Sequence, residues 1–186
     1  MKNIIQNIRR LFFDNSCTCC GEKASDNLIY LCYNCLDKIV RQKSLNKVGD
    51  TYYIWPYKGE FRKLLLEYKN NSRLALGKII SSLIEEEIFK VVYEEDIDYI
   101  VPIPINFRRE QIRGFNQVEE ILKNLNYSFL KTNRVKNTKK MFKILDKEKR
   151  ENNIKNSFKV DKEFKAKNIL IFDDIITTGA TIEEFK

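Results

Sequence analysis

Histidine is absent from this sequence of 186 residues. Its absence excludes imidazole as a metal ligand, as a general base and as a group that titrates near neutral pH. Any proton transfer must therefore use carboxylates, Lys, Tyr, Cys or groups of a substrate.

Long apolar runs are also absent, and none could span a membrane. The N-terminal segment is not a secretory signal, because polar residues interrupt it and no small-residue cleavage site follows. Its apolar residues recur at helical spacing, which favours a short packed helix over a membrane-surface anchor: Ile4, Ile5, Ile8, Leu11 and Phe12. With 43% hydrophobic and 32% charged residues, the composition predicts a soluble, cytoplasmic protein without membrane insertion.

Cysteine is missing after residue 35, so all five cysteines lie in one short segment. Cys17-x-x-Cys20 and Cys32-x-x-Cys35 are separated by eleven residues. Each pair can present two thiolates from one tight turn, and two such turns complete a tetrahedral site. The spacing predicts a structural Zn²⁺ ribbon, whereas a disulfide pair would need an exported protein. Cys19 is expected not to be a ligand, although a register with Cys19 in place of Cys20 stays open.

The cysteine module is expected to end near Lys47. Residues 29–31 resemble a short strand before the second pair, and the polar stretch Lys38–Asp50 indicates a helix end followed by a linker. We therefore expect residues 1–47 to form an N-terminal helix and zinc ribbon, and residues 51–186 to form a second domain.

Charge is unevenly distributed along the chain, whose net charge is +8. Residues 84–98 hold seven acids against one lysine, whereas residues 131–167 hold 14 Lys and Arg against five acids. A basic segment of this density could attract pyrophosphate, a nucleotide or single-stranded DNA. A solvated, lysine-rich surface without a ligand is an equally good interpretation.

Two acids follow a predicted strand near the end of the sequence. Residues 169–172 form a continuous apolar run, as expected of a parallel strand covered on both faces. Asp173 and Asp174 then stand at the strand end, where open α/β sheets place their ligands. The next residues offer hydroxyls and open backbone N–H groups at a helix start: Thr177, Thr178, Gly179, Ala180 and Thr181. This order predicts a ligand with sugar hydroxyls and a phosphate.

A second predicted strand, 98–101, runs into a loop stiffened by Pro102 and Pro104. Three arginines follow closely: Arg108, Arg109 and Arg113. Guanidinium forks suit phosphate oxygens, and Gly114 allows close approach, so this region predicts an anion site. Apolar periodicity further predicts a strand at 51–55 and helices at 60–69, 76–84 and after Phe115.

The strand, the acid pair and the Thr-Thr-Gly-Ala-Thr turn resemble the phosphoribosyl-pyrophosphate (PRPP) signature of type I phosphoribosyltransferases. With the cysteine pairs, the Val-Pro-Ile-Pro segment and Arg-Gly-Phe-Asn-Gln, the chain resembles the ComF family of competence proteins. The resemblance implies an α/β fold: a type I phosphoribosyltransferase-like parallel sheet with flanking helices, preceded by a small zinc-ribbon module.

The resemblance also implies roles for the residues. Asp173 and Asp174 would contact the ribose hydroxyls of PRPP, and residues 177–181 would hold its 5′-phosphate. Pro102 would begin the loop that faces pyrophosphate, and Mg²⁺ would bridge pyrophosphate and ribose oxygens. Weaker candidates for the pyrophosphate are Arg108, Arg109 and Arg113.

Two functions are compatible with this resemblance. A ComF-like protein would bind PRPP or a related nucleotide and act in DNA uptake during natural transformation. Its partners would be a DNA helicase and a recombination mediator, with single-stranded DNA as a further ligand. Alternatively, the chain is an active phosphoribosyltransferase of nucleotide metabolism that transfers ribose 5-phosphate from PRPP to a nitrogen acceptor.

The sequence departs from the family pattern at two places. Met141 and Ile144 stand where the family has Gln and Leu, and methionine cannot make the hydrogen bonds of an amide. The sequence also ends at Lys186, where the family continues, so we expect a C-terminally truncated domain.

Overall fold

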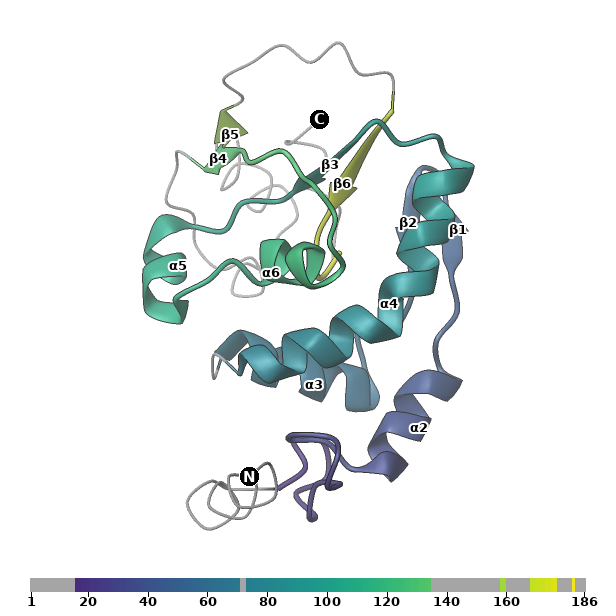
Figure 1. The fold of residues 1–186 in the computed structure, drawn as a ribbon, viewed down its shortest axis with the longest axis vertical. Coiled ribbons are helices and arrows are strands. Elements are labelled where there is room, and N and C mark those ends of the chain that lie inside the picture. Colours follow the sequence, from purple (N-terminus) through teal and green to yellow (C-terminus); the bar gives the residue numbers. More distant parts are fainter. Residues whose placement is uncertain (1–15, 71–72, 135–157, 160–167, 177–181, 183–186) are drawn as a thin grey trace, which may run out of the picture. The chain divides into compact units, whose positions relative to one another are not determined.

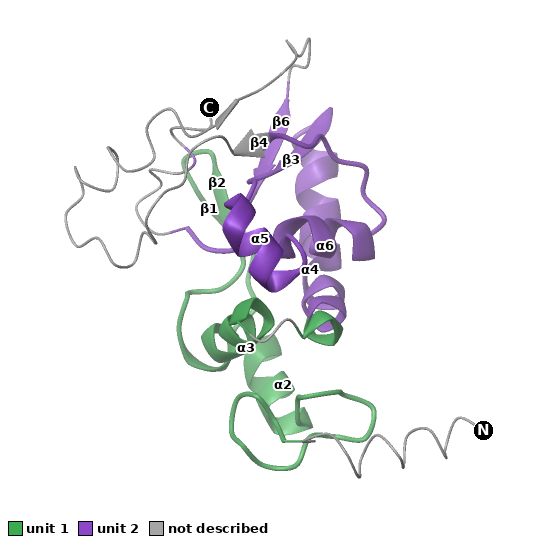
Figure 2. Ribbon diagram, turned by 90° about the vertical axis from the view of Figure 1, so that its left-hand side faces the viewer, with its two compact units in different colours: residues 1–76 green, residues 77–186 purple. Residues whose placement is uncertain are grey.

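The computed structural model describes residues 16–70, 73–134, 158–159, 168–176 and 182. The chain divides into two compact units, residues 1–76 and 77–186, which Figure 2 colours green and purple. The domain limits predicted from the sequence, 1–47 and 51–186, stay a prediction. Within the described ranges, no helix is both long enough and apolar enough to cross a membrane.

The first unit holds the cysteine segment, two helices and a hairpin. Its elements are α2 (Tyr33–Arg41), β1 (Asn46–Val48), β2 (Thr51–Tyr53) and α3 (Gly59–Asn70). Helix α3 was predicted from its apolar stripe, which supplies the buried Leu64, Leu65 and Tyr68. The N-terminal helix predicted near residues 4–12 lies outside the described residues.

Trp55 is the main packing residue between these elements. Its side chain is 8% exposed, and its ring stacks on Phe61 of α3 with the ring centroids 4.3 Å apart. Its indole Nε1–H donates to the carbonyl of Ile39 in α2 over 2.9 Å. One side chain therefore fixes α2 and α3 to the end of the hairpin, using apolar area and its single polar group together.

Two local predictions in this unit were wrong. The stretch expected to be a linker contains β1, which pairs antiparallel with β2 around Gly49 and Asp50. Gly49 has φ 57°, the left-handed conformation that a two-residue hairpin turn requires. Residues 29–31 form no strand, because Tyr30 has φ 67° and turns the chain.

The second unit combines helices with short strands. Its elements are α4 (Leu74–Glu94, starting just before the unit), β3 (Tyr99–Pro102), α5 (Phe107–Arg113), α6 (Gln117–Asn124), β4 (Asn133–Arg134), β5 (Phe158–Lys159) and β6 (Ile169–Phe172). Strand β3 pairs in parallel with β6, from Tyr99 opposite Ile169 to Pro102 opposite Phe172. Figure 1 shows these two strands side by side, although they are far apart in the sequence. Strands β4 and β5 form a separate antiparallel pair.

The parallel pair confirms the mixed α/β character predicted from the sequence. Among the described residues its sheet has two strands, so a phosphoribosyltransferase-like sheet stays a prediction. Strand β3 is buried from Ile100 to Pro102, whereas Ile169 of β6 is 42% exposed and the rest of β6 is half-buried. The expected cover on both faces of β6 is therefore not seen in the part of the chain that the structure describes.

Asn168 sets the register of the parallel pair. Its side-chain amide donates to the carbonyls of Glu95 and Asp96, directly after α4, over 3.0 and 3.2 Å. Its backbone N–H donates to the carboxylate of Asp98 over 2.9 Å. These bonds hold the start of β6 beside the start of β3, so the two strands also end together.

Candidate functional site

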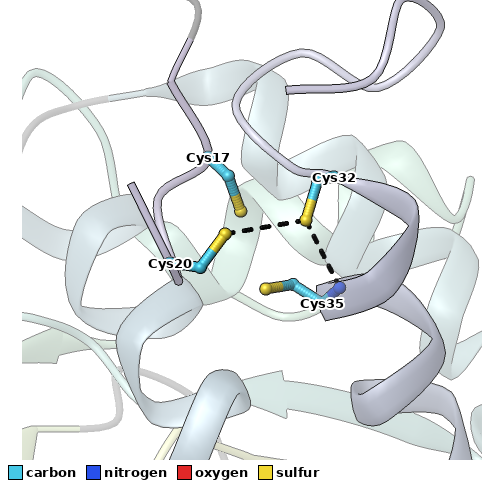
Figure 3. Close-up of side chains that lie close together, drawn as sticks. All are labelled: Cys17, Cys20, Cys32 and Cys35. Carbon is cyan, nitrogen blue, oxygen red and sulfur yellow. Dashed lines mark hydrogen bonds between the residues drawn. The ribbon is translucent and has the colours of Figure 1, made fainter. Parts of the chain in front are cut away.

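Four cysteine sulfurs come together in the first unit. The Sγ atoms of Cys17, Cys20, Cys32 and Cys35 all lie within 4.8 Å of one another, and Figure 3 shows the four side chains converging. Three of these residues are buried and Cys20 is exposed. The spacing of the two cysteine pairs thus gives the cluster that the sequence predicted.

The dimensions of the cluster fit zinc. A tetrahedral ion with Zn–S bonds of about 2.3 Å places its sulfurs about 3.8 Å apart. The Sγ atoms of Cys20 and Cys32 are 3.7 Å apart. Thiolate is also a preferred ligand of Zn²⁺, so the four residues could hold this ion with no coordination position left for catalysis.

Local backbone structure builds each half of the cluster. In the first half, the N–H of Gly21 donates to the Cys17 carbonyl over 2.8 Å, and Gly21 has φ 81°. This left-handed turn brings Cys20 back towards Cys17. In the second half, Cys32 is the N-cap of α2, and its Sγ accepts from the N–H of Cys35. A helix N-terminus favours negative charge, which suits thiolate ligands.

The thiols of the cluster have widely different proton affinities. Burial raises the pKa of Cys17, but backbone N–H donors, chiefly that of Cys20, bring it down to about 6. Burial raises the pKa of Cys35 strongly, and the neighbouring thiols raise it further. A metal ion would therefore meet a cluster that is partly ionised already and would displace the remaining protons.

Cys19 has a different environment from the other four cysteines. Its Sγ donates to the carbonyl of Glu60 in α3 over 3.4 Å, while its own carbonyl accepts from Lys63 Nζ over 2.7 Å. Burial, followed by the nearby charge of Cys17, raises the pKa of Cys19 to about 12. The side chain is thus a buried thiol that joins the cysteine turn to α3.

A second candidate site lies in the second unit, where β3 and β6 end. Asp173 and Asp174 follow β6, and Pro102 closes β3 opposite Phe172. The N–H of Ile103 donates to the carbonyl of Phe172 over 2.9 Å, which keeps the ends of the two strands together. Asp173 also accepts from the N–H of Asp174 over 2.8 Å. The structure therefore brings the predicted acids to the predicted proline loop.

The three arginines that follow the proline loop lie on helix α5. Asn106 caps the start of α5 by accepting from the N–H of Arg108 over 3.0 Å. Gly114 ends this helix with φ 83°. Arg108 is exposed, whereas Arg109 is half-buried, and burial lowers the pKa of its guanidinium.

Arg113, at the end of α5, is linked to the acid pair through one side chain. Its guanidinium donates to Oε1 of Gln117, and Nε2 of Gln117 donates to Oδ2 of Asp174 over 2.7 Å. Gln117 thus connects a cationic candidate of the site, Arg113, with an anionic one, Asp174, by hydrogen bonds.

Three buried polar residues lie beside the site, and sequence reasoning gave their side chains no role of their own: Asn106, Asn116 and Gln117. Asn116 caps α6 by accepting from the N–H of Val118 over 3.0 Å. Both asparagines stand directly before a helix, and asparagine is a preferred N-cap residue. This preference is the sequence signal that could have found them. The predicted phosphate residues Thr177, Thr178, Gly179, Ala180 and Thr181 lie outside the described residues.

Comparison with known proteins gives several relatives. The chain is 26% identical over 177 residues to DNA utilization protein YhgH of Escherichia coli (strain K12), covering 90% of this chain and 74% of the relative. It is 31% identical over 144 residues to competence protein ComFC of Streptococcus pneumoniae, covering 72% and 58%. It is 26% identical over 182 residues to competence protein F of Haemophilus influenzae, covering 89% and 75%.

No family model matches the chain, and no solved structure matches it significantly. The named relatives nevertheless confirm the resemblance to the ComF family that the sequence motifs indicated.

Proposed function

We propose that this homologue of competence and DNA utilization proteins binds PRPP or a related nucleotide and acts in DNA uptake. The observation that supports this ligand is the shared end of β3 and β6, where Asp174 of the acid pair is hydrogen-bonded through Gln117 to Arg113. Carboxylates suit sugar hydroxyls and arginine suits phosphate oxygens. A phosphorylated sugar needs both kinds of group in one place.

Within this proposal each residue has a defined task. Asp173 and Asp174 would accept hydrogen bonds from the ribose hydroxyls. The loop that begins at Pro102 would face the pyrophosphate, together with Arg113, which is joined to Asp174 by hydrogen bonds through Gln117. Residues 177–181 would receive the 5′-phosphate. Mg²⁺, brought with the ligand, would supply positive charge between the pyrophosphate and ribose oxygens.

The role in DNA uptake is supported by the names of the relatives, which refer to competence and DNA utilization. We propose that the protein acts there in the cytoplasm as an adaptor for a DNA helicase and a recombination mediator. The cysteine cluster, with its zinc, would stabilise the surface that such a partner contacts. Single-stranded DNA is the further ligand proposed for the basic segment 131–167, through contacts with phosphates.

Calorimetric titration with PRPP and Mg²⁺ tests the ligand site. We expect Asp173→Asn and Asp174→Asn each to weaken binding about 10-fold to 100-fold, because a hydrogen bond to a charged group contributes ~1.5–3 kcal/mol. The double variant should show no measurable binding. Glu110→Gln is the matched control, since it removes an exposed carboxylate from α5 and should leave affinity unchanged.

The same experiment separates the two functions. No binding by the unaltered protein at millimolar PRPP would refute the ligand site. Release of pyrophosphate in the presence of a nitrogen acceptor would establish the enzyme instead of a binding protein. Equal binding by the double variant and the unaltered protein would place PRPP elsewhere on the chain.

A further inference from the structure

Gln117 is the last residue of the Arg-Gly-Phe-Asn-Gln segment, and neither the resemblance nor the comparisons give its side chain a role. It is the first residue of α6, its side chain is 5% exposed, and it lies between a cation and an anion. Arg113 of α5 donates to one end of its amide, and the other end donates to Asp174 beyond β6 over 2.7 Å. Three segments of the second unit therefore meet at one side chain.

The chemistry of the two neighbours fixes how this amide must point. Arginine has only donors and an ionised carboxylate has only acceptors. The amide oxygen must therefore face Arg113, and the amide nitrogen must face Asp174. A side-chain amide offers a donor and an acceptor on two separate atoms without carrying a charge, and glutamine at this position uses both.

The surrounding backbone holds Gln117 in place. Asn116 caps α6 directly before it, and the left-handed Gly114 ends α5 directly after Arg113. The side chain of Asn116 also donates to Glu119 over 3.2 Å, which fixes the first turn of α6. Because Gln117 is buried and its helix start is capped, its amide has few other orientations available.

We propose that Gln117 is a positioning residue, which holds the Asp174 carboxylate and the Arg113 guanidinium in the orientations that one ligand requires. This inference rests on the proposed function: the carboxylate serves the sugar of the ligand and the guanidinium serves its phosphates. Gln117 itself need not touch the ligand. Its effect on binding would pass through the two charged side chains that it links.

Three variants test this role by calorimetry with PRPP and Mg²⁺. Gln117→Glu keeps the acceptor for Arg113 but sets a second carboxylate against Asp174, so we expect binding to weaken about 100-fold. Gln117→Met keeps the volume and removes both hydrogen bonds, with an expected loss of about 10-fold. Gln111→Met, at an exposed position of α5, is the matched control and should bind as the unaltered protein does.

A rescue variant distinguishes positioning from simple packing. Gln117→Asn shortens the amide by one methylene, and Asp174→Glu lengthens the carboxylate by one. Each alone should weaken binding, whereas the two together should restore much of the lost affinity. Inorganic pyrophosphate is the second probe: Gln117→Met should weaken its binding less than that of PRPP, because pyrophosphate has no ribose for Asp174 to contact.

The outcomes separate this inference from the function on which it rests. Suppose that the unaltered protein binds PRPP and that Asp173→Asn binds it more weakly. If a folded Gln117→Met variant then binds normally, the positioning role is wrong and the ligand site stands. If the unaltered protein does not bind, both are wrong. Should the variants fail to fold, NMR spectra of the unaltered protein test the role instead. The side-chain amide signal of Gln117 must then shift when PRPP is added. A constant signal overturns the positioning role.

Discussion

Replacing Cys17 and Cys20 together by serine should abolish metal binding and unfold the first unit. The two residues supply half of the sulfur cluster, and structural zinc contributes ~10–16 kcal/mol of apparent folding free energy in small zinc modules. A whole domain is stable by only ~5–15 kcal/mol, so the loss exceeds what the remaining contacts can offset.

The unfolding should reach beyond the cysteine turns into α3. The turn is bound to this helix by the Cys19 thiol on Glu60 and by Lys63 on the Cys19 carbonyl. Arg73 adds a hydrogen bond to Thr18 over 3.3 Å and lies over the ring of Tyr30 at 4.2 Å. Without the metal these contacts lose the fixed turn on which they depend.

Metal stoichiometry and tryptophan fluorescence measure this prediction together. Trp55 is the single tryptophan of the sequence, so a red-shifted emission reports the first unit alone. Cys19→Ser is the control: it removes a buried thiol outside the cluster and should retain one metal ion per chain. A double variant that stays folded without metal would contradict a structural role for the cluster.

Trp55→Ala should be the most destabilising single change in the apolar part of the first unit. It removes a buried ring that stacks on Phe61, and it leaves the Ile39 carbonyl without its indole donor. Large aromatic-to-alanine changes in cores cost ~3–5 kcal/mol. Trp55→Phe is the matched variant, since it keeps most of the stacking area and loses only the N–H donor.

The rate at which a thiol reagent labels Cys19 measures the effect. Cys19 is buried, so it reacts when the first unit opens, and the opening equilibrium rises tenfold per ~1.4 kcal/mol. We expect labelling to accelerate more than about 100-fold in Trp55→Ala and less in Trp55→Phe. Equal rates in all three proteins would show that Trp55 does not hold the unit closed.

The sequence could predict features that depend on spacing or on strand ends. Two Cys-x-x-Cys pairs bring four sulfurs together because each pair needs only a tight turn. The acids after β6 lie beside Pro102 at the end of β3 because parallel strands that start together also end together. Neither inference required knowledge of the helices around them.

Features that depend on tertiary contacts could not be predicted from the sequence. The burial of Gln117 arises from residues on three separate elements, and an isolated glutamine gives no sign of it. The arginine helix α5 has no buried residue, so it lacks the apolar stripe by which helices are recognised. The hairpin of β1 and β2, in contrast, could have been predicted from the sequence, because Gly49-Asp50 is a known turn signal.

The parallel pairing of β3 with β6 has a consequence for synthesis on the ribosome. Asp98 and Asn168, which align the two strands, are 70 residues apart. At ~5–20 residues per second, β3 would wait roughly 4 to 14 seconds for its partner. The contacts described for the cysteine turns and α3 lie within the first 76 residues, so this unit can take up its metal during that interval. The nascent chain would then carry a first unit with these contacts in place and a strand edge without its partner, which could pair with another chain until β6 is made.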